Sequence, residues 1–73
     1  MKTISEHAVI ARINRKLKPD LEALKVTRGE RMRQNVGDHY VLDYRRNCVT
    51  DTHVDPEQMA RDLGVLADWE QVA

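Results

Sequence analysis

The sequence is poor in the residues that build a large rigid core or a covalent staple. Its 73 residues include no phenylalanine, one tryptophan, two tyrosines and a single cysteine. One cysteine cannot form an intrachain disulfide, which excludes the disulfide-stabilised secreted domains. No apolar run approaches the roughly 20 residues of a membrane span, and Met1 to Ser5 lack the apolar core of a signal peptide. We therefore expect a cytoplasmic protein that does not act in a membrane.

Glycine and proline are scarce and scattered, which excludes low-complexity linkers. The three glycines, Gly29, Gly37 and Gly64, stand far apart, so no glycine-rich phosphate loop exists. The length is a third to a half of a usual domain, so residues 1–73 form one domain. The charged share of 33% and the hydrophobic share of 41% are typical of a globular chain.

The net charge of zero hides a marked asymmetry between the two halves of the chain. Residues 1–37 hold nine Lys or Arg and four Asp or Glu, a net charge of +5, whereas residues 38–73 have a net charge of −5. The halves either pair internally or present a bipolar surface that steers a charged partner. A zero total disfavours a dedicated nucleic-acid-binding protein, which is usually basic overall.

The first expected element is an amphipathic helix over residues 4–17. Thr3 is a suitable N-cap, and Glu6, three residues later, completes a capping box. One stripe of the helix holds the apolar residues Val9, Ile10, Ile13 and Leu17. Pro19 disfavours helical geometry at the residue before it, so the helix ends there.

Residues 20–37 admit two interpretations. Leu21, Leu24, Arg28 and Met32 could form a helical stripe, but Leu24 to Arg28 alternates in the manner of a strand. Gly29 weakens a continuous helix. We favour a strand over residues 23–28 that could resume as far as Met32, followed by a turn over residues 35–38.

A hairpin follows, with strands over residues 39–44 and 48–50. Tyr40, Leu42 and Tyr44 share one face, which we expect to be the core face. A two-residue loop at Arg46-Asn47 would set Tyr44 opposite Val49, although a longer loop remains open because arginine does not readily adopt positive φ.

A second helix is expected over residues 56–63, capped by Asp55 with Pro56 at its first position. The tail should fold back as a last helical turn, with Trp69 covering the edge of the core. The order of helix, two or three antiparallel strands and helix predicts an α+β two-layer sandwich. The predicted core residues are Val9, Ile13, Leu17, Tyr40, Leu42, Tyr44, Val49, Met59 and Leu63.

Three stretches, residues 8–17, 37–43 and 55–69, together resemble a loose set of small bacterial proteins of about this length, often met among mobile or accessory genes. That set implies no assigned activity. In size and class the chain is also similar to phage-encoded inhibitors of host defence such as anti-CRISPR proteins, which are short, single-domain and without catalysis. This second likeness rests on no motif and implies a role for no residue.

No constellation of residues predicts catalysis or a cofactor. His7, His39, His53 and Cys48 lack the spacing of metal ligands along one element. Cys48 could act as a nucleophile with His39 or His53 as base, but a lone cysteine on a short strand is usually a packing residue. A domain of this size also lacks the depth for a water-excluding pocket. We expect a non-enzymatic protein with no cofactor and no metal.

The interpretation that fits best is a protein-binding module that meets an acidic or phosphate-like surface through a basic helix face. An anti-CRISPR-like inhibitor would be one such module. The candidate partner-binding residues are Arg12, Arg15, Lys18 and Arg28. The sheet face with Val41 and Cys48 would be left open for a target or for a second copy in a homodimer. The alternative is a small nucleic-acid-binding regulator that uses the same basic residues, with Tyr40 and Tyr44 stacking on bases.

Overall fold

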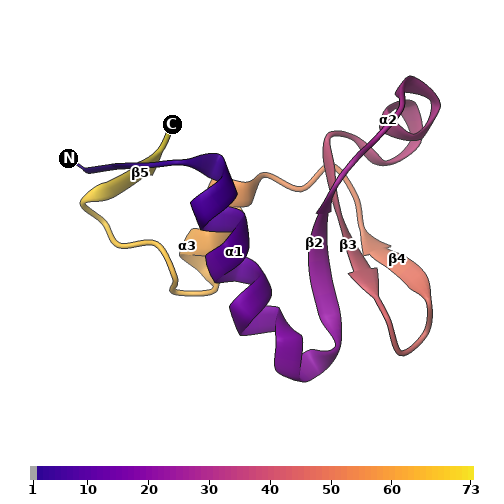
Figure 1. Ribbon diagram of the computed structural model, residues 1–73, viewed down its shortest axis with the longest axis horizontal. Helices are drawn as coiled ribbons and strands as arrows, with labels where there is room; N and C mark the ends of the chain where they lie inside the picture. Colours follow the sequence, from indigo (N-terminus) through magenta and orange to yellow (C-terminus); the bar gives the residue numbers. More distant parts are fainter. Residues whose placement is uncertain (1) are drawn as a thin grey trace.

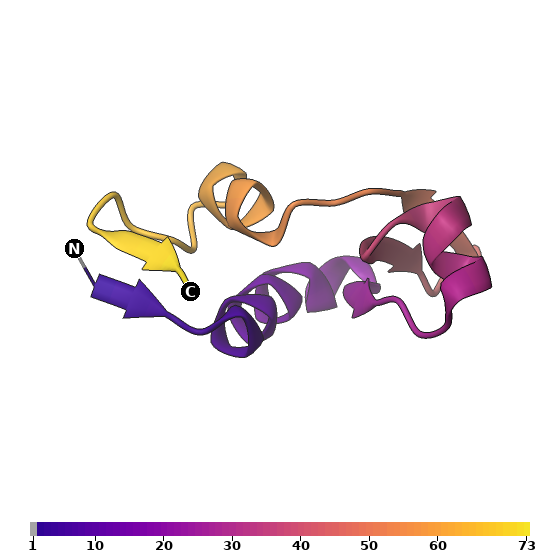
Figure 2. The same ribbon diagram turned by 90° about the horizontal axis from the view of Figure 1, so that it is seen from above.

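The computed structural model describes residues 2–73 as a flat α+β domain, in agreement with the predicted fold class. In chain order the elements are β1 (Lys2–Ile4), α1 (Glu6–Leu17), the 3-10 turn η1 (Lys18–Asp20), β2 (Glu22–Val26), α2 (Glu30–Val36), β3 (His39–Asp43), β4 (Cys48–Asp51), α3 (Pro56–Asp62) and β5 (Glu70–Val72). Strands β2, β3 and β4 form an antiparallel sheet, and β1 pairs with β5 in parallel. The molecule measures 35 × 29 × 15 Å, with the two-stranded sheet, the helices α1 and α3, and the three-stranded sheet following one another along its length (Figure 2). Within residues 2–73, no helix has the length and apolar character needed to cross a membrane.

The core lies where α1 meets α3 and one face of the three-stranded sheet. Helices α1 and α3 both lie on the same side of the strands, with α2 beyond their upper ends (Figure 1). The buried apolar side chains are Ile4, Val9, Ile13, Leu17, Leu24, Val41, Ala60 and Leu66. The i, i+4, i+8 stripe of α1 is therefore buried as predicted, because that spacing places its residues on one side of a helix.

The start of α1 differs from the prediction. The N-cap is Ser5, whose Oγ accepts a hydrogen bond from the backbone N–H of Ala8 at 3.1 Å. Thr3 instead lies in β1 opposite Gln71 of β5. The predicted N-cap at Thr3 is wrong because pairing with the distant C-terminal strand extends the backbone there, and a local capping pattern contains no information about that pairing.

Strand β2 confirms a strand in the segment predicted at 23–28, although it ends at Val26. The resumption toward Met32 is wrong because residues 30–36 form α2. Gly29 and Gly37 bound this short helix with φ of 88° and 79°. A glycine at each end separates α2 from the flanking strands, and the turn predicted at 35–38 is correspondingly confined to Gly37 and Asp38.

The core face of β3 is the reverse of the predicted one. Val41 is 4% exposed and pairs with Leu24 of β2, which is 2% exposed, whereas Tyr44 is 50% exposed. Both faces of β3 offer apolar side chains, so alternation alone does not identify the buried one. The contacts of α1 with β2 decide the matter by burying the face of Leu24.

Other parts of the predicted core are corrected in the same way. Val49 pairs with Leu42, not with Tyr44, across the turn 44–47. Val49 is 39% exposed, and Trp69, expected to cover the core, is 68% exposed in the turn directly before β5. Met59 and Leu63 are partly buried against the core. The tail forms β5 instead of a helical turn because β1 offers it a pairing edge.

Asn14 of α1 closes the outer edge of β2. Its Oδ1 accepts a hydrogen bond from the N–H of Leu24 at 2.7 Å, and its Nδ2 donates to the Leu24 carbonyl at 3.3 Å. One side chain thus satisfies the two backbone groups that a fourth strand would otherwise meet. The accessible surface of the sheet is therefore its outer face rather than this position on its edge.

Candidate binding surface

The face of the three-stranded sheet that turns away from the core is apolar, aromatic and accessible. Cross-strand pairing aligns Ala23 with Leu42, Lys25 with Tyr40, and Leu42 with Val49. These five residues alternate with the buried Leu24 and Val41, so they lie on the opposite face. We call them the open sheet face, and all five are half-buried or exposed.

Tyr44 extends this face at the end of β3. Its backbone N–H donates to the carbonyl of Leu21 at 2.9 Å, and the Lys25 ammonium lies over its ring, 5.6 Å from the centroid. Hydrogen bonding with the Tyr44 hydroxyl raises the pKa of Lys25. Tyr44 and Leu21 are 50% and 48% exposed. A cation and an aromatic ring therefore lie side by side in solvent on this face.

Two hollows flank the open sheet face along the direction of β2. The smaller, of about 260 Å³, is lined by Asn14, Lys18, Leu21, Glu22, Ala23 and Tyr44. The larger, of about 720 Å³, is lined by His7, Ile10, Asn14, Leu24, Lys25, Val26, Arg28, Met32 and Tyr40. Bases and tyrosines consequently follow one another from one end of β2 to the other. We call this sequence of residues the basic–aromatic strip: Lys18, Tyr44, Lys25, Tyr40 and Arg28.

The structure does not gather all four predicted partner-binding residues on one free surface. Arg12 lies 3.0 Å from the Glu70 carboxylate and donates a hydrogen bond to the Val65 carbonyl at 3.2 Å. Its charge is engaged within the fold, contrary to the expectation of a free basic helix face. Arg15 is exposed on α1, and Lys18 is exposed at the end of that helix.

Arg12 and Arg28 also lie on different sides of α1. Arg28 lines the larger hollow together with Ile10 and Asn14, and both of those residues are about 160° from Arg12 around a helix with 100° per residue. The structure therefore separates Arg28 from Arg12, whereas Arg12 and Arg15 stay neighbours three residues apart on α1. Lys18 and Arg28 instead lie on one surface, because Lys18 lines a hollow with Tyr44 and Arg28 lines the other with Tyr40.

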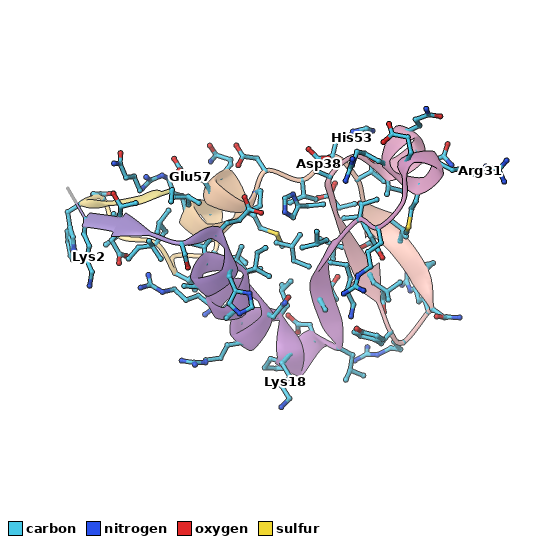
Figure 3. All side chains as sticks on the ribbon, turned by 45° about the horizontal axis from the view of Figure 1, so that its top comes forward. Lys2, Lys18, Arg31, Asp38, His53 and Glu57 are labelled. Atoms are coloured by element: carbon cyan, nitrogen blue, oxygen red, sulfur yellow. The ribbon has the colours of Figure 1, made fainter. Side chains whose placement is uncertain are left out.

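Most basic residues of the first half have no acidic partner inside the molecule. Of its nine Lys and Arg, only Arg12 and Arg33 lie within 4.0 Å of a carboxylate in residues 2–73. Lys2, Lys18 and Arg31 point outward at three separate ends of the molecule (Figure 3). Most of the positive charge of the first half is therefore not neutralised by nearby carboxylates. The bases that lie beside aromatic rings are those of the basic–aromatic strip.

Lys25, Tyr40 and Tyr44 are the surface residues that the sequence interpretation assigned elsewhere. The favoured interpretation placed both tyrosines in the core and left Lys25 out of the partner-binding residues, whereas the nucleic-acid alternative already stacked both tyrosines on bases. A signal was present in β2, where Lys25 stands between Leu24 and Val26. A lysine in the middle of an alternating strand indicates the solvent side, and its cross-strand partner Tyr40 shares that side.

Within residues 2–73, Cys48 and the histidines do not come together as a catalytic or metal-binding site. Cys48 is exposed, and its sulfur has no hydrogen-bond partner there. His39 is buried with its Nε2 3.1 Å from Glu6 Oε1. His53 packs against Gly37, beside the labelled Asp38 (Figure 3). In the same residues, no group of three His, Cys, Asp or Glu side chains could hold a metal ion.

Comparison of the chain with protein-family models, with curated proteins and with solved structures finds no match.

Proposed function

We propose that the protein is a non-enzymatic binding module that holds an anionic macromolecule against its open sheet face. The observation on which the proposal rests is the basic–aromatic strip, where two exposed or half-buried tyrosines lie among three bases. Aromatic rings provide rigid contact area at low entropic cost, and clustered bases attract an anionic partner. This proposal retains the acidic or phosphate-like partner expected from the sequence. It places the contact on the open sheet face and not on the basic face of the first helix.

The distribution of acidic residues supports an anionic partner. Cross-strand pairing places Glu22 with Asp43, and Asp51 with the buried Val41, on the face opposite Lys25. Glu22 reaches the rim of the smaller hollow, and it is the single acid among the lining residues of the two hollows in residues 2–73. A negatively charged partner would therefore meet attraction along most of the strip.

The proposal keeps the cytoplasmic location expected from the sequence. Action as an anti-CRISPR-like inhibitor and assembly as a homodimer stay predictions. A partner protein with an acidic surface is compatible with the proposal.

Retention on immobilised heparin, a generic polyanion, tests the proposal. The parent protein should bind at low salt, and Lys25→Glu should elute at a clearly lower salt concentration. Lys2→Glu is the matched control, since it makes the same change of charge at an exposed position on β1, outside the strip. Circular dichroism checks that both variants fold. No retention of the parent protein, or equal elution of the two variants, would contradict the proposal.

A further inference from the structure

We infer that the anionic partner is single-stranded nucleic acid, whose unpaired bases stack on Tyr44 and Tyr40 while its phosphates meet Lys18, Lys25 and Arg28. This inference rests on the proposed function and names the chemistry of its partner. It uses the alternation of ring and cation along the strip, a pattern that neither a purely acidic surface nor a duplex would exploit.

The two tyrosines have the placement that stacking requires. They stand four residues apart along β3 and its extension, so their Cα atoms are about 13 Å apart. Tyr44 is 50% exposed, and Tyr40 lines the larger hollow. Bases that are not paired in a duplex expose their faces, and an antiparallel sheet with aromatic side chains on its open face accepts such bases.

The cations are positioned for a backbone that runs along β2. Lys18 lines the smaller hollow with Tyr44, Lys25 lies over the Tyr44 ring, and Arg28 lines the larger hollow with Tyr40. None of the three has an acidic partner within 4.0 Å in residues 2–73. Phosphates would therefore displace only mobile counterions there, and not an internal ion pair.

A duplex fits this surface less well. Duplex bases are stacked inside the helix and offer their faces to no ring, so the tyrosines would add nothing to duplex affinity. Base-edge readout in the major groove commonly uses a helix with several free polar residues on one side. The longest helix, α1, uses Arg12 against Glu70 and Asn14 against β2, which leaves Arg15 and Lys16 as its exposed bases.

Fluorescence anisotropy with a labelled 12-nucleotide oligothymidylate is the decisive measurement. We expect binding that weakens with salt, with a slope of about −2 in log K against log salt if three phosphates are neutralised. A duplex of equal length and polyglutamate should bind more weakly. Lys18→Gln should reduce the slope by about 0.7, and Lys2→Gln, its control outside the strip, should leave the slope unchanged.

The tyrosines are tested by ring removal. Tyr44→Ala should weaken oligothymidylate binding about 5- to 150-fold, the range measured for loss of one stacked base, and Tyr44→Phe should keep most of the affinity. Trp69→Ala is the matched aromatic control, because Trp69 is 68% exposed in the turn before β5, away from the strip. It should bind like the parent.

Failure of this inference is distinguishable from failure of the proposed function. Retention on heparin without binding of oligothymidylate would overturn the inference and leave the module for an anionic partner standing. Equal affinity for polyglutamate and oligothymidylate, or Tyr44→Ala binding as well as Trp69→Ala, would do the same. Absence of both activities would overturn both, as would a dimer that Tyr44→Ala converts into monomers and that binds neither probe.

Discussion

Residues with a left-handed backbone conformation lie in the connections between helices and strands. Leu21, Asn47 and His53 are non-glycine residues with φ of 59°, 52° and 53°. The left-handed conformation of Leu21 ends η1 and sets the chain on its path into β2, where the Leu21 carbonyl accepts from Tyr44. His53 has a second constraint, since its N–H donates to the Val36 carbonyl at 2.7 Å and its ring packs against Gly37. The three residues thus lie where η1 meets β2, where β3 turns into β4, and where β4 leads toward α3.

Substitution of Gly37 tests this close approach. A Cβ at position 37 would lie 2.6 Å from His53 Nδ1 and 2.9 Å from His53 Cα, and φ is 79°. Gly64→Ala is the matched control, because Gly64 has φ of 73° with no atom within 4 Å of an added Cβ. We expect Gly64→Ala to cost about 1–2 kcal/mol from backbone strain alone, and Gly37→Ala to cost more. Urea unfolding measures both, and equal losses would show that His53 yields freely.

At the scale of elements, α1 organises the fold because its different sides contact the core, the edge of β2 and the C-terminal segment. The stripe of Val9, Ile13 and Leu17 fills the core, Asn14 closes the edge of β2, and Arg12 binds the C-terminal segment. The helix therefore determines which sheet face is covered. The open sheet face is accessible because α1 covers the other one.

The N-cap of α1 provides the test at this scale. Ser5→Ala removes the acceptor for the Ala8 N–H and should cost about 1 kcal/mol, within the usual range of 0.5–2. Thr3→Ala is the control and should change stability by no more than about 0.5 kcal/mol, because Thr3 is exposed in β1. Thermal unfolding of the two variants measures both losses of stability and shows which residue caps α1. A larger loss for Thr3→Ala would restore the cap expected from the sequence.

At the scale of the whole molecule, polar contacts tie the two ends of the chain together. The Glu70 carboxylate accepts from Arg12 at 3.0 Å and from the Ala67 N–H at 2.9 Å. Arg61 donates to the Glu70 carbonyl at 2.9 Å, and the Glu57 carboxylate accepts from the Val72 N–H at 3.0 Å. These contacts hold β5 beside β1, so the C-terminal strand depends on charges in α1 and α3.

Stability should depend on pH through Glu70. The hydrogen bond from Arg12, followed by that from the Ala67 N–H, lowers the pKa of Glu70 below its ordinary value of 4.5. A carboxyl whose pKa is lowered by folding stabilises the fold fully above its unfolded pKa, and this stabilisation is lost as the pH falls through the folded value. Glu70→Gln should therefore unfold more easily than the parent at pH 7, and the difference should shrink below about pH 4.5.

The control for this prediction is Asp68→Asn, which neutralises an exposed carboxylate two residues away. It should not reproduce the loss at pH 7. Urea titrations at several pH values make the comparison. A constant difference between Glu70→Gln and the parent from pH 7 to pH 2 would contradict a role for the ionised carboxylate.

The sequence by itself determined the features that depend on neighbours within one or two turns. The apolar stripe of α1, the cap of α3 at Asp55 and the strands β2, β3 and β4 follow from spacing and local hydrogen bonding. The α+β class follows from their order. The sequence also identified Lys18 and Arg28 as surface cations. It did not identify the sheet surface on which the two residues lie.

Tertiary structure alone decided which face of the sheet is buried and which cations are free. When both faces of an alternating strand have apolar residues, the pattern does not distinguish them. The docking of α1 on β2 buries the face that holds Leu24 and its partner Val41, and it leaves Tyr40 and Tyr44 on the other face. Arg12 is engaged because Glu70 approaches from 58 residues away. The pairing of β1 with β5 likewise moved the cap from Thr3 to Ser5. Contacts between distant segments have no local signature, because their energies depend on surfaces that exist only after the chain has folded.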